Sequence, residues 1–405
     1  MVLGAHVSRS AEHLRRIAGG CCLLVTASAC TYGYVTDSQS GDPIGGATVS
    51  FDALKVSESH KSATTFSGTS KAVKTWSASD PNSGGHDGLY YLNPNGQKND
   101  GDTTSVSVAA GWQRVKISKS GFDTAIFYRD HQYSDTCETY GSLPYPDAKY
   151  PINLEASKPT GAKTICVQQD FSLSPNTSNY EKQPDILVDP RSLNDNQIAT
   201  NGDCKYKDDN GKEKQYSKCL RMSVGTPNVG AGDLHVLGEL NFWGRVINVR
   251  QRVYKRNSGY VDREIPSDFT YEDALGHKHF HFMNWTKLRL RKYDAACPTQ
   301  GWSGCPELKT GRKISFCLED IYTFESGIAT GKKYNCEVES GSRDISQGIS
   351  VGMQDVYAKS VYGQVIDISG LAAGTYWLEA EVNPEHIMTE RDYSNNTARV
   401  TVQIP

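Results

Sequence analysis

The sequence predicts an all-β protein made of two β-sandwich-like domains, the C-terminal one with long loops and few helices. Three observations support this fold class. At 405 residues the chain is long enough for two or three domains, each with its own core. It contains 37 Gly and 22 Tyr, and Asn, Asp and Ser recur at turns. Apolar residues alternate over short stretches and form few long runs with a period of 3.6 residues, so long helices are not expected.

The charges are nearly balanced, with 43 Lys and Arg against 46 Asp and Glu and a net charge of −3. A chain of this kind has no general attraction for nucleic acid or for acidic membranes. We therefore expect no nucleic-acid partner.

Residues 1–29 resemble a signal peptide. Arg15 and Arg16 precede a largely apolar run over 17–25, and Ala27-Ser28-Ala29 follows as a small-residue cleavage signal. The apolar run is short for a membrane span, and no later stretch is long enough, so no transmembrane segment is expected. The sequence predicts export and leaves periplasm, cell surface and extracellular medium open.

Cleavage after Ala29 makes Cys30 the first mature residue and leaves an even number of other cysteines, as a disulfide framework requires. These are Cys137, Cys166, Cys204, Cys219, Cys297, Cys305, Cys317 and Cys336. Cys30 resembles the acylated residue of bacterial lipoproteins, although Ala27 is a poor match to the leucine usual in that motif. A strand-like sequence also begins at once, without a tether. Lipid anchor and free secretion both stay open.

Residues 30–157 form the first expected domain. The stretch 32–51 shows two alternating strands around a Gly/Asp/Pro turn, and 112–122 adds another alternating segment. Both stretches resemble the regulatory-like β-sandwich module of carboxypeptidases, which is usually accessory. Residues 158–183 are richer in Pro, Thr, Ser and Asn and lack a clear period, so we place a linker there. Within it, Cys166 is a candidate partner for Cys137.

A histidine strand dominates the second domain. His277, His279 and His281 occupy alternate positions, so their side chains point to one face of an extended strand. Three imidazoles can bind copper, zinc, nickel or iron and leave a position open for chemistry. The alternative is an exposed histidine-rich edge strand. Phe280 and Phe282 lie on the opposite face, which is expected to pack into a core while the histidines line a cleft.

A series of motifs over 184–405 resembles, in the same order, the catalytic domain of lysyl oxidases. The matching stretches are P-D-I-L-V-D-P at 184–190, L-R-M at 220–222 with Asn228, Gly230 and Asp233, H-K-H-F-H-F-M at 277–283, G-R-K-I-S-F-C-L-E-D at 311–320, D-V-Y at 355–357, I-D-I at 366–368, G-T-Y at 374–376, N-P at 383–384 and E-R-D-Y-S-N-N at 390–396. Departures are Met353 and Gly363, where animal members carry cysteines, and a segment between Lys313 and Tyr357 that is longer than in animal relatives. Cys317 and Cys336 keep the positions of one family disulfide.

This resemblance implies a copper amine oxidase with a lysine tyrosylquinone made from Lys313 and Tyr357. A tyrosine beside copper can be oxidised by oxygen to an ortho-quinone, which a neutral lysine amine then attacks. The implied substrates are oxygen and primary amines, including peptidyl lysine, and the products are aldehyde, ammonia and hydrogen peroxide. Asp355 is the carboxylate nearest Tyr357 in sequence, but it also suits a turn, so the catalytic base stays unassigned.

The resemblance also implies a structural calcium ion. Hard oxygen ligands are expected from Asp185, Ile186, Glu390, Asp392, Asn395 and Asn396. The alternative is a hairpin turn rich in Asx residues.

Two further functions remain open for the histidine strand. It could belong to a non-catalytic module that binds metal at a surface, or to a hydrolytic zinc site. Only the oxidase needs both Lys313 and Tyr357, so these two residues discriminate the hypotheses.

Overall fold

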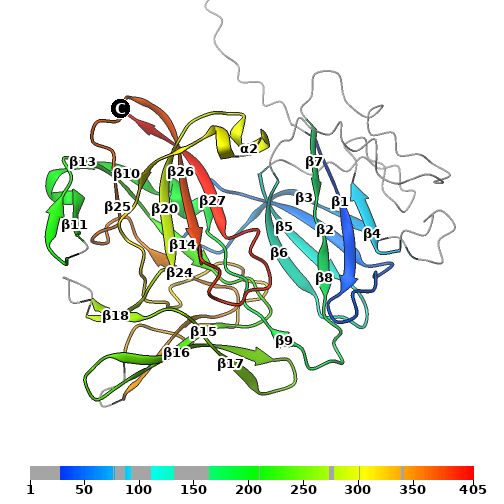
Figure 1. The fold of residues 1–405 in the computed structure, drawn as a ribbon. Helices are drawn as coiled ribbons and strands as arrows, with labels where there is room; N and C mark the ends of the chain where they lie inside the picture. The colour runs from blue at the N-terminus through cyan, green and yellow to red at the C-terminus, as the bar shows by residue number, and fades with distance from the viewer. Residues whose placement is uncertain are drawn as a thin grey trace, which may run out of the picture.

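A computed structural model describes residues 28–75, 77, 87–92, 111–131, 164–208, 210–272, 278–300, 302–338 and 342–405. It confirms the all-β fold class (Figure 1). Within these ranges helix is limited to α1 Pro190–Asn194, α2 Cys297–Gln300 and the 3-10 turns η2 Asn201–Cys204 and η3 Trp302–Gly304. No helix in the described ranges is both long and apolar enough to cross a bilayer. Residues 1–27 of the expected signal peptide, Cys137 and His277 lie outside the described residues.

The described residues of the N-terminal domain form two sheets. The first has the order β4-β1-β7, with β8 also paired to β1, and the second has the order β3-β2-β5-β6. Their bounds are β1 Ser28–Asp37, β2 Thr48–Leu54, β3 Phe66–Lys74, β4 Leu89–Leu92, β5 Gly111–Ser118, β6 Ala125–His131, β7 Thr164–Gln168 and β8 Phe171–Leu173. A core between the sheets includes Val35, Phe51, Tyr90, Ile117 and Phe127. Two sheets around one core agree with a β-sandwich.

Three strands lie inside the segment 158–183 that we expected to be a linker, and two of them, β7 and β8, join a sheet of the N-terminal domain. Both β7 and β8 pair in parallel with β1, with Cys30 and Cys166 as Cα partners. The short alternation Phe171-Ser172-Leu173 buries its two apolar side chains in the N-terminal core. A three-residue strand carries too little periodicity to stand out among turn-forming residues. In addition, β1 begins at Ser28, two residues before the predicted mature N-terminus.

The sheet β3-β2-β5-β6 is buried on both faces. Along β6, Phe127 points into the N-terminal core, whereas Ile126 and Tyr128 pack into the larger core of the C-terminal domain. Trp112 of β5 and Leu54 of β2 join that second core. Alternate side chains of a strand lie on opposite faces, so this single sheet serves two cores. The two domains therefore share a continuous apolar interface.

The C-terminal domain is built from small sheets connected by long loops, which lie to the left of the N-terminal strands in Figure 1. Their orders are β10-β13-β25, β11-β12, β14-β24-β22, β17-β16-β15-β23 with β9 on β16, β18-β19 and β21-β20-β26-β27. The bounds are β9 Glu181–Lys182, β10 Asn196–Thr200, β11 Lys205–Lys207, β12 Glu213–Gln215, β13 Lys218–Met222, β14 Val224–Pro227, β15 Leu234–Leu240, β16 Val246–Lys255, β17 Tyr260–Glu264, β18 Phe269–Glu272, β19 His279–Phe282, β20 Thr286–Lys292, β21 Glu307–Thr310, β22 Tyr322–Thr323, β23 Asp344–Ile349, β24 Met353–Tyr357, β25 Val365–Asp367, β26 Gly374–Val382 and β27 Thr397–Ile404.

Disulfides lock three loops of this domain. The described pairs are Cys204–Cys219, Cys297–Cys305 and Cys317–Cys336. The last pair is the one that the family resemblance implied. Closing loops in this way reduces the conformational freedom of the unfolded chain and stabilises the folded one.

Candidate active site

Strand β19 carries His279 and His281, the two histidines of the predicted metal motif that lie within the described residues. The Nε2 atoms of His279 and His281 lie 3.0 Å apart. His281 is 1% exposed, and His279 is partly buried. A spacing near 3 Å suits two nitrogens that share one metal ion bound about 2 Å from each. The described pair therefore fits the copper ion that the resemblance implied.

The opposite face of β19 follows the prediction only in part. Phe282 is fully buried in the core, where its ring lies 5.4 Å from that of Phe269. Phe280 is partly buried and packs against Tyr271 of β18. His281 is as buried as Phe282, so the histidine face is enclosed rather than open.

A backbone bridge holds the segment around Lys313 against β19. The N–H of Phe282 donates to the carbonyl of Phe316 over 2.7 Å, and the N–H of Phe316 donates back over 3.1 Å. The N–H of Trp285 also donates to the carbonyl of Ile314. These bonds fix the loop that carries Lys313 beside the histidine strand.

Tyr357 completes this arrangement from the end of β24. Its ring centre lies 4.0 Å from that of Phe316, and its Oη accepts a hydrogen bond of 2.5 Å from the backbone N–H of Cys317. The same Oη lies 3.5 Å from His281 Nε2. Burial, with the nearby Asp355, raises the pKa of Tyr357 well above its usual range. Without a bound cation the phenol is therefore neutral.

Lys313 lies close to the tyrosine ring. Its Nζ is 5.3 Å from the ring centre of Tyr357, and the residue is 9% exposed. Burial lowers the pKa of Lys313 to about 8, while Glu272 and Asp355 oppose this shift. A substantial fraction of the amine is thus uncharged near neutral pH, the form in which nitrogen is a nucleophile.

Asp355 lies two residues before Tyr357 on β24, so the two side chains share one face of the strand. It is 1% exposed, and neither carboxyl oxygen has a hydrogen-bond partner in the described part of the chain. Burial, with nearby Glu319, raises the pKa of Asp355 well above its usual range. The geometry agrees with a proton-holding group, but it does not connect Asp355 to a substrate, and the base stays unassigned.

One apparent ligand set near the site does not bind metal as it stands. His279 lies within 4.8 Å of the sulfurs of Cys317 and Cys336. These sulfurs form a disulfide, whereas metal coordination by cysteine requires a thiolate. Among the described residues of the motif, His279 and His281 therefore remain the candidate metal ligands.

Sequence analysis missed Glu272. This residue is the direct partner of His279 in the β18–β19 pairing. Burial lowers the pKa of both His279 and Lys313, and the charge of Glu272 opposes this shift. The alternating stretch Phe269–Glu272 before the histidines was the available signal for a strand pairing with them.

The residues expected to bind calcium converge between the first and last segments of the C-terminal domain. Asp185 accepts a 2.8 Å hydrogen bond from the side-chain amide of Asn395. The N–H of Ile186 donates to Glu390 over 2.7 Å, and the amide of Asn396 donates to Glu390 over 2.9 Å.

Two observations bear on whether these residues fit calcium. The side-chain oxygens of Asn395 and Asn396 are buried without a hydrogen-bond partner among the described residues, as expected for oxygens that can coordinate a cation. Two carboxylates already face cations, because Asp185 pairs with Arg391 at 2.6 Å and Asp392 pairs with Arg129 of β6. These oxygens fit calcium. Because Arg391 and Arg129 pair with two of the carboxylates, the cluster carries less net negative charge than the sequence motif alone indicated.

Comparisons with known proteins relate this chain to lysyl oxidases. Residues 241–404 match the family model described as "Lysyl oxidase". Lysyl oxidase homolog 1 of Homo sapiens is 31% identical over 187 residues, which cover 46% of this chain and 28% of that protein. Protein-lysine 6-oxidase of Rattus norvegicus is 32% identical over 156 residues, which cover 38% of this chain and 33% of that protein. Lysyl oxidase homolog 2 of Gallus gallus is 32% identical over 302 residues, which cover 71% of this chain and 34% of that protein. The matched part spans about a third of each relative.

Proposed function

Because residues 241–404 carry a lysyl oxidase family domain, we propose that this protein is an exported, copper-dependent amine oxidase. Its substrates are primary amines, including lysine side chains of proteins, together with oxygen. Its products are aldehydes, ammonia and hydrogen peroxide. The single observation that carries the proposal is the convergence of Lys313, Tyr357 and His281 from three separate segments.

His279 and His281 would hold the copper ion together with His277 of the same motif, and their neutral imidazoles supply nitrogen ligands. Copper and the quinone formed from Tyr357 and Lys313 would supply the two-electron oxidation of the amine, with oxygen as the electron acceptor.

Tyr357 is held where oxidation of its ring would begin. Phe316 packs against its ring, and the Cys317 N–H fixes its oxygen beside His281. The phenol therefore directs its oxygen toward His281, which would hold the copper ion. Lys313 approaches the ring itself, so the two residues are arranged for a covalent bond between lysine nitrogen and a ring carbon.

The formation of this bond balances as follows. Oxidation of the tyrosine ring to the ortho-quinone consumes one oxygen molecule and releases one water. Addition of the Lys313 amine to a ring carbon gives a reduced ring, and a second oxygen molecule restores the quinone with release of hydrogen peroxide. The joined residues therefore gain one oxygen atom and lose four hydrogen atoms relative to the free side chains.

Export is part of this proposal. The disulfides Cys204–Cys219, Cys297–Cys305 and Cys317–Cys336 are suited to an oxidising compartment. A signal peptide ending near Ala29 would deliver the chain there. A calcium ion held by the residues around Asp185 and Glu390 would add structural stability.

The test is to load the purified chain with copper under oxygen and to search its digest by mass spectrometry for the peptides of Lys313 and Tyr357 joined together. Amine-dependent release of hydrogen peroxide is measured on the same sample. Lys313→Arg is the matched control, because arginine keeps a long cationic side chain but is not a nucleophile. Separate, unmodified peptides in an active parent would refute the quinone mechanism. The same result in an inactive, copper-loaded parent would favour a metal-binding module.

A further inference from the structure

We propose that the N-terminal domain is a positioning element of the oxidase, and that it acts through the loop between β2 and β3, which holds the tyrosine strand β24 at Gln354. This inference rests on the proposed function for its catalytic consequence. It gives the N-terminal module a role that its resemblance to accessory β-sandwiches does not supply.

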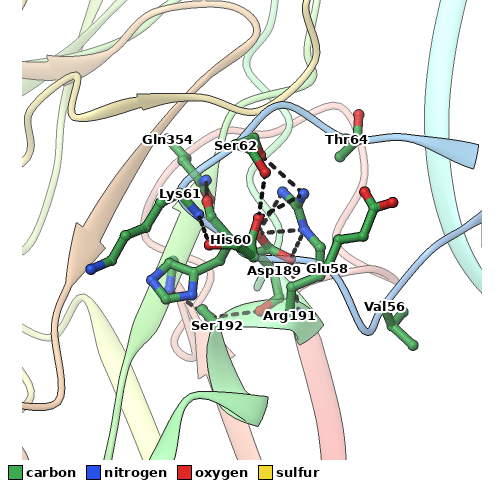
Figure 2. Close-up of polar contacts among 12 residues, drawn as sticks. Val56, Glu58, His60, Lys61, Ser62, Thr64, Asp189, Arg191, Ser192 and Gln354 are labelled. Atoms are coloured by element: carbon green, nitrogen blue, oxygen red, sulfur yellow. Dashed lines mark hydrogen bonds and ion pairs between the residues drawn. The ribbon is translucent and has the colours of Figure 1, made fainter.

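The loop enters the C-terminal domain through backbone carbonyls (Figure 2). The carbonyl of His60 accepts a hydrogen bond from the side-chain amide of Gln354. The carbonyl of Ser62 accepts one of 3.0 Å from Arg191. Both donors are buried, with Gln354 at 0% and Arg191 at 2% exposure. The loop therefore fills positions that would otherwise leave buried donors unpaired.

Arg191 is prepared for this contact by its own domain. Asp189 binds the guanidinium through both carboxylate oxygens, at 2.9 to 3.1 Å, and also caps α1. The N–H of Asp189 donates to the carbonyl of Gly225 on β14, the neighbour of β24. Arg191 is therefore fixed beside the sheet β14-β24-β22, and its remaining N–H groups face the loop.

Gln354 transmits the contact to the site. It lies on β24 between Pro227 of β14 and Tyr322 of β22. Successive strand residues face opposite sides, so Gln354 points toward the loop while Asp355 and Tyr357 point to the side of His281. One short strand therefore carries the loop's anchor on one face and the reactive phenol on the other.

A second anchor holds the approach to the same strand. The N–H of Thr64 donates to the carbonyl of Phe324 over 2.7 Å, and the N–H of Phe324 donates to the carbonyl of Gly352 over 2.8 Å. Gly352 immediately precedes β24. The loop thus reaches the beginning of β24 by two routes, one through Gln354 and one through Phe324.

Glu325 reinforces this second anchor with side chains of the N-terminal domain. Its carboxylate accepts hydrogen bonds of 2.6 Å from Tyr128 and 3.1 Å from Arg114. Glu325 is 3% exposed and Tyr128 is fully buried. A buried carboxylate needs such partners, so the C-terminal domain depends on the N-terminal one at this point.

The experiment compares two variants of the full chain with the parent. Gln354→Met keeps a long side chain but removes the donor to the loop. The second variant replaces residues 56–63 with Asn-Gly, which leaves the sequence of the C-terminal domain unchanged. In each, hydrogen exchange of the β24 amides and the rate of Lys313–Tyr357 cross-linking after copper addition are measured well below the melting temperature. Arg256→Ala is the matched control, because it breaks another interdomain contact, with Asp123.

We expect both variants to bind copper as the parent does, to exchange the β24 amides about tenfold faster or more, and to cross-link about tenfold more slowly or worse, because small misplacements of reacting groups are costly. Arg256→Ala should remain within about twofold of the parent in both measurements. If one variant does not fold, the other decides the matter.

Unchanged exchange at β24 would overturn the positioning role, whatever the chemistry proves to be. Equal slowing in Arg256→Ala would also overturn it, because general loosening would then explain the effect. If the parent itself forms no cross-link, the proposed function fails, and the exchange result alone decides whether the loop positions β24.

Discussion

The amine of Lys313 lies 5.3 Å from the ring centre of Tyr357, although 43 other residues separate the two in the chain. The loop of Lys313 is held by β19, and Tyr357 is held by its own strand β24. These two supports together bring the amine of Lys313 next to the ring of Tyr357. Proximity of this kind replaces the entropy loss of a bimolecular encounter.

Replacing Tyr357 with Phe should retain copper and abolish both cross-link and amine oxidation, because the ring loses the oxygen from which the quinone forms. The variant also leaves the Cys317 N–H without its acceptor, so the free energy of unfolding should fall by about 1–3 kcal/mol. Metal analysis, absorbance of the quinone and denaturant unfolding measure these effects. A coloured, active Tyr357→Phe protein would contradict the assignment.

Cross-link formation should depend on pH through Lys313. Below its pKa of about 8 the amine is protonated and cannot attack, so the rate should rise about tenfold per pH unit and level off above pH 8. The charged groups around it are Glu272, Asp355 and Lys207. Stopped-flow absorbance after copper addition between pH 6 and 9 measures the rate.

Glu272→Gln provides the control for that profile. Glu272 raises the pKa of Lys313, so its loss should move the midpoint of the rate profile to lower pH. A midpoint that stays in place, or moves upward, would show that another group controls the rate.

Removal of any of the three histidines of the motif at 277–283 should cut copper content sharply. His277→Ala, His279→Ala and His281→Ala are the variants, and copper per chain is the measurement. His281 is 1% exposed, so its truncation also leaves a cavity and should lower stability more than truncation of the partly buried His279. Near-stoichiometric copper in a folded variant would remove that residue from the ligand set.

Calcium should raise the melting temperature of the parent, because a ligand that binds only the native state stabilises it by mass action. The ion would join Asp185, near the start of the C-terminal domain, to Glu390 and Asn396 near its end. Asp392→Ala should weaken the calcium effect. An unchanged melting temperature on chelation, or the same calcium effect in Asp392→Ala as in the parent, would argue that Arg391 and Arg129 alone neutralise the cluster.

The sequence was informative wherever the signal was local. The period of two at His279 and His281 predicted a common face, and both Nε2 atoms do converge. The short strand Phe171–Leu173 was missed because three residues give little periodicity. The disulfide partners of Cys204 and Cys297 could not be assigned, since spacing alone does not determine pairing.

Contacts between the domains were beyond sequence analysis for another reason. The bond from Gln354 joins the backbone carbonyl of His60, and a carbonyl has no signature in the residue type. Nothing in the sequence links Arg129 to Asp392, and they pair only because β6 docks on the C-terminal domain. Such pairs become visible only when two separately folded surfaces are placed together.

The sheet β3-β2-β5-β6, with Phe127 in one core and Tyr128 in the other, affects how the whole chain denatures. Unfolding of the C-terminal domain would expose one apolar face of this sheet, and unfolding of the N-terminal domain would remove the sheet from the C-terminal core. Neither domain can therefore melt without raising the free energy of its neighbour. Differential scanning calorimetry of the intact chain should accordingly give one heat-absorption peak, not two, and proteolytic fragments of the two domains should remain associated during size-exclusion chromatography.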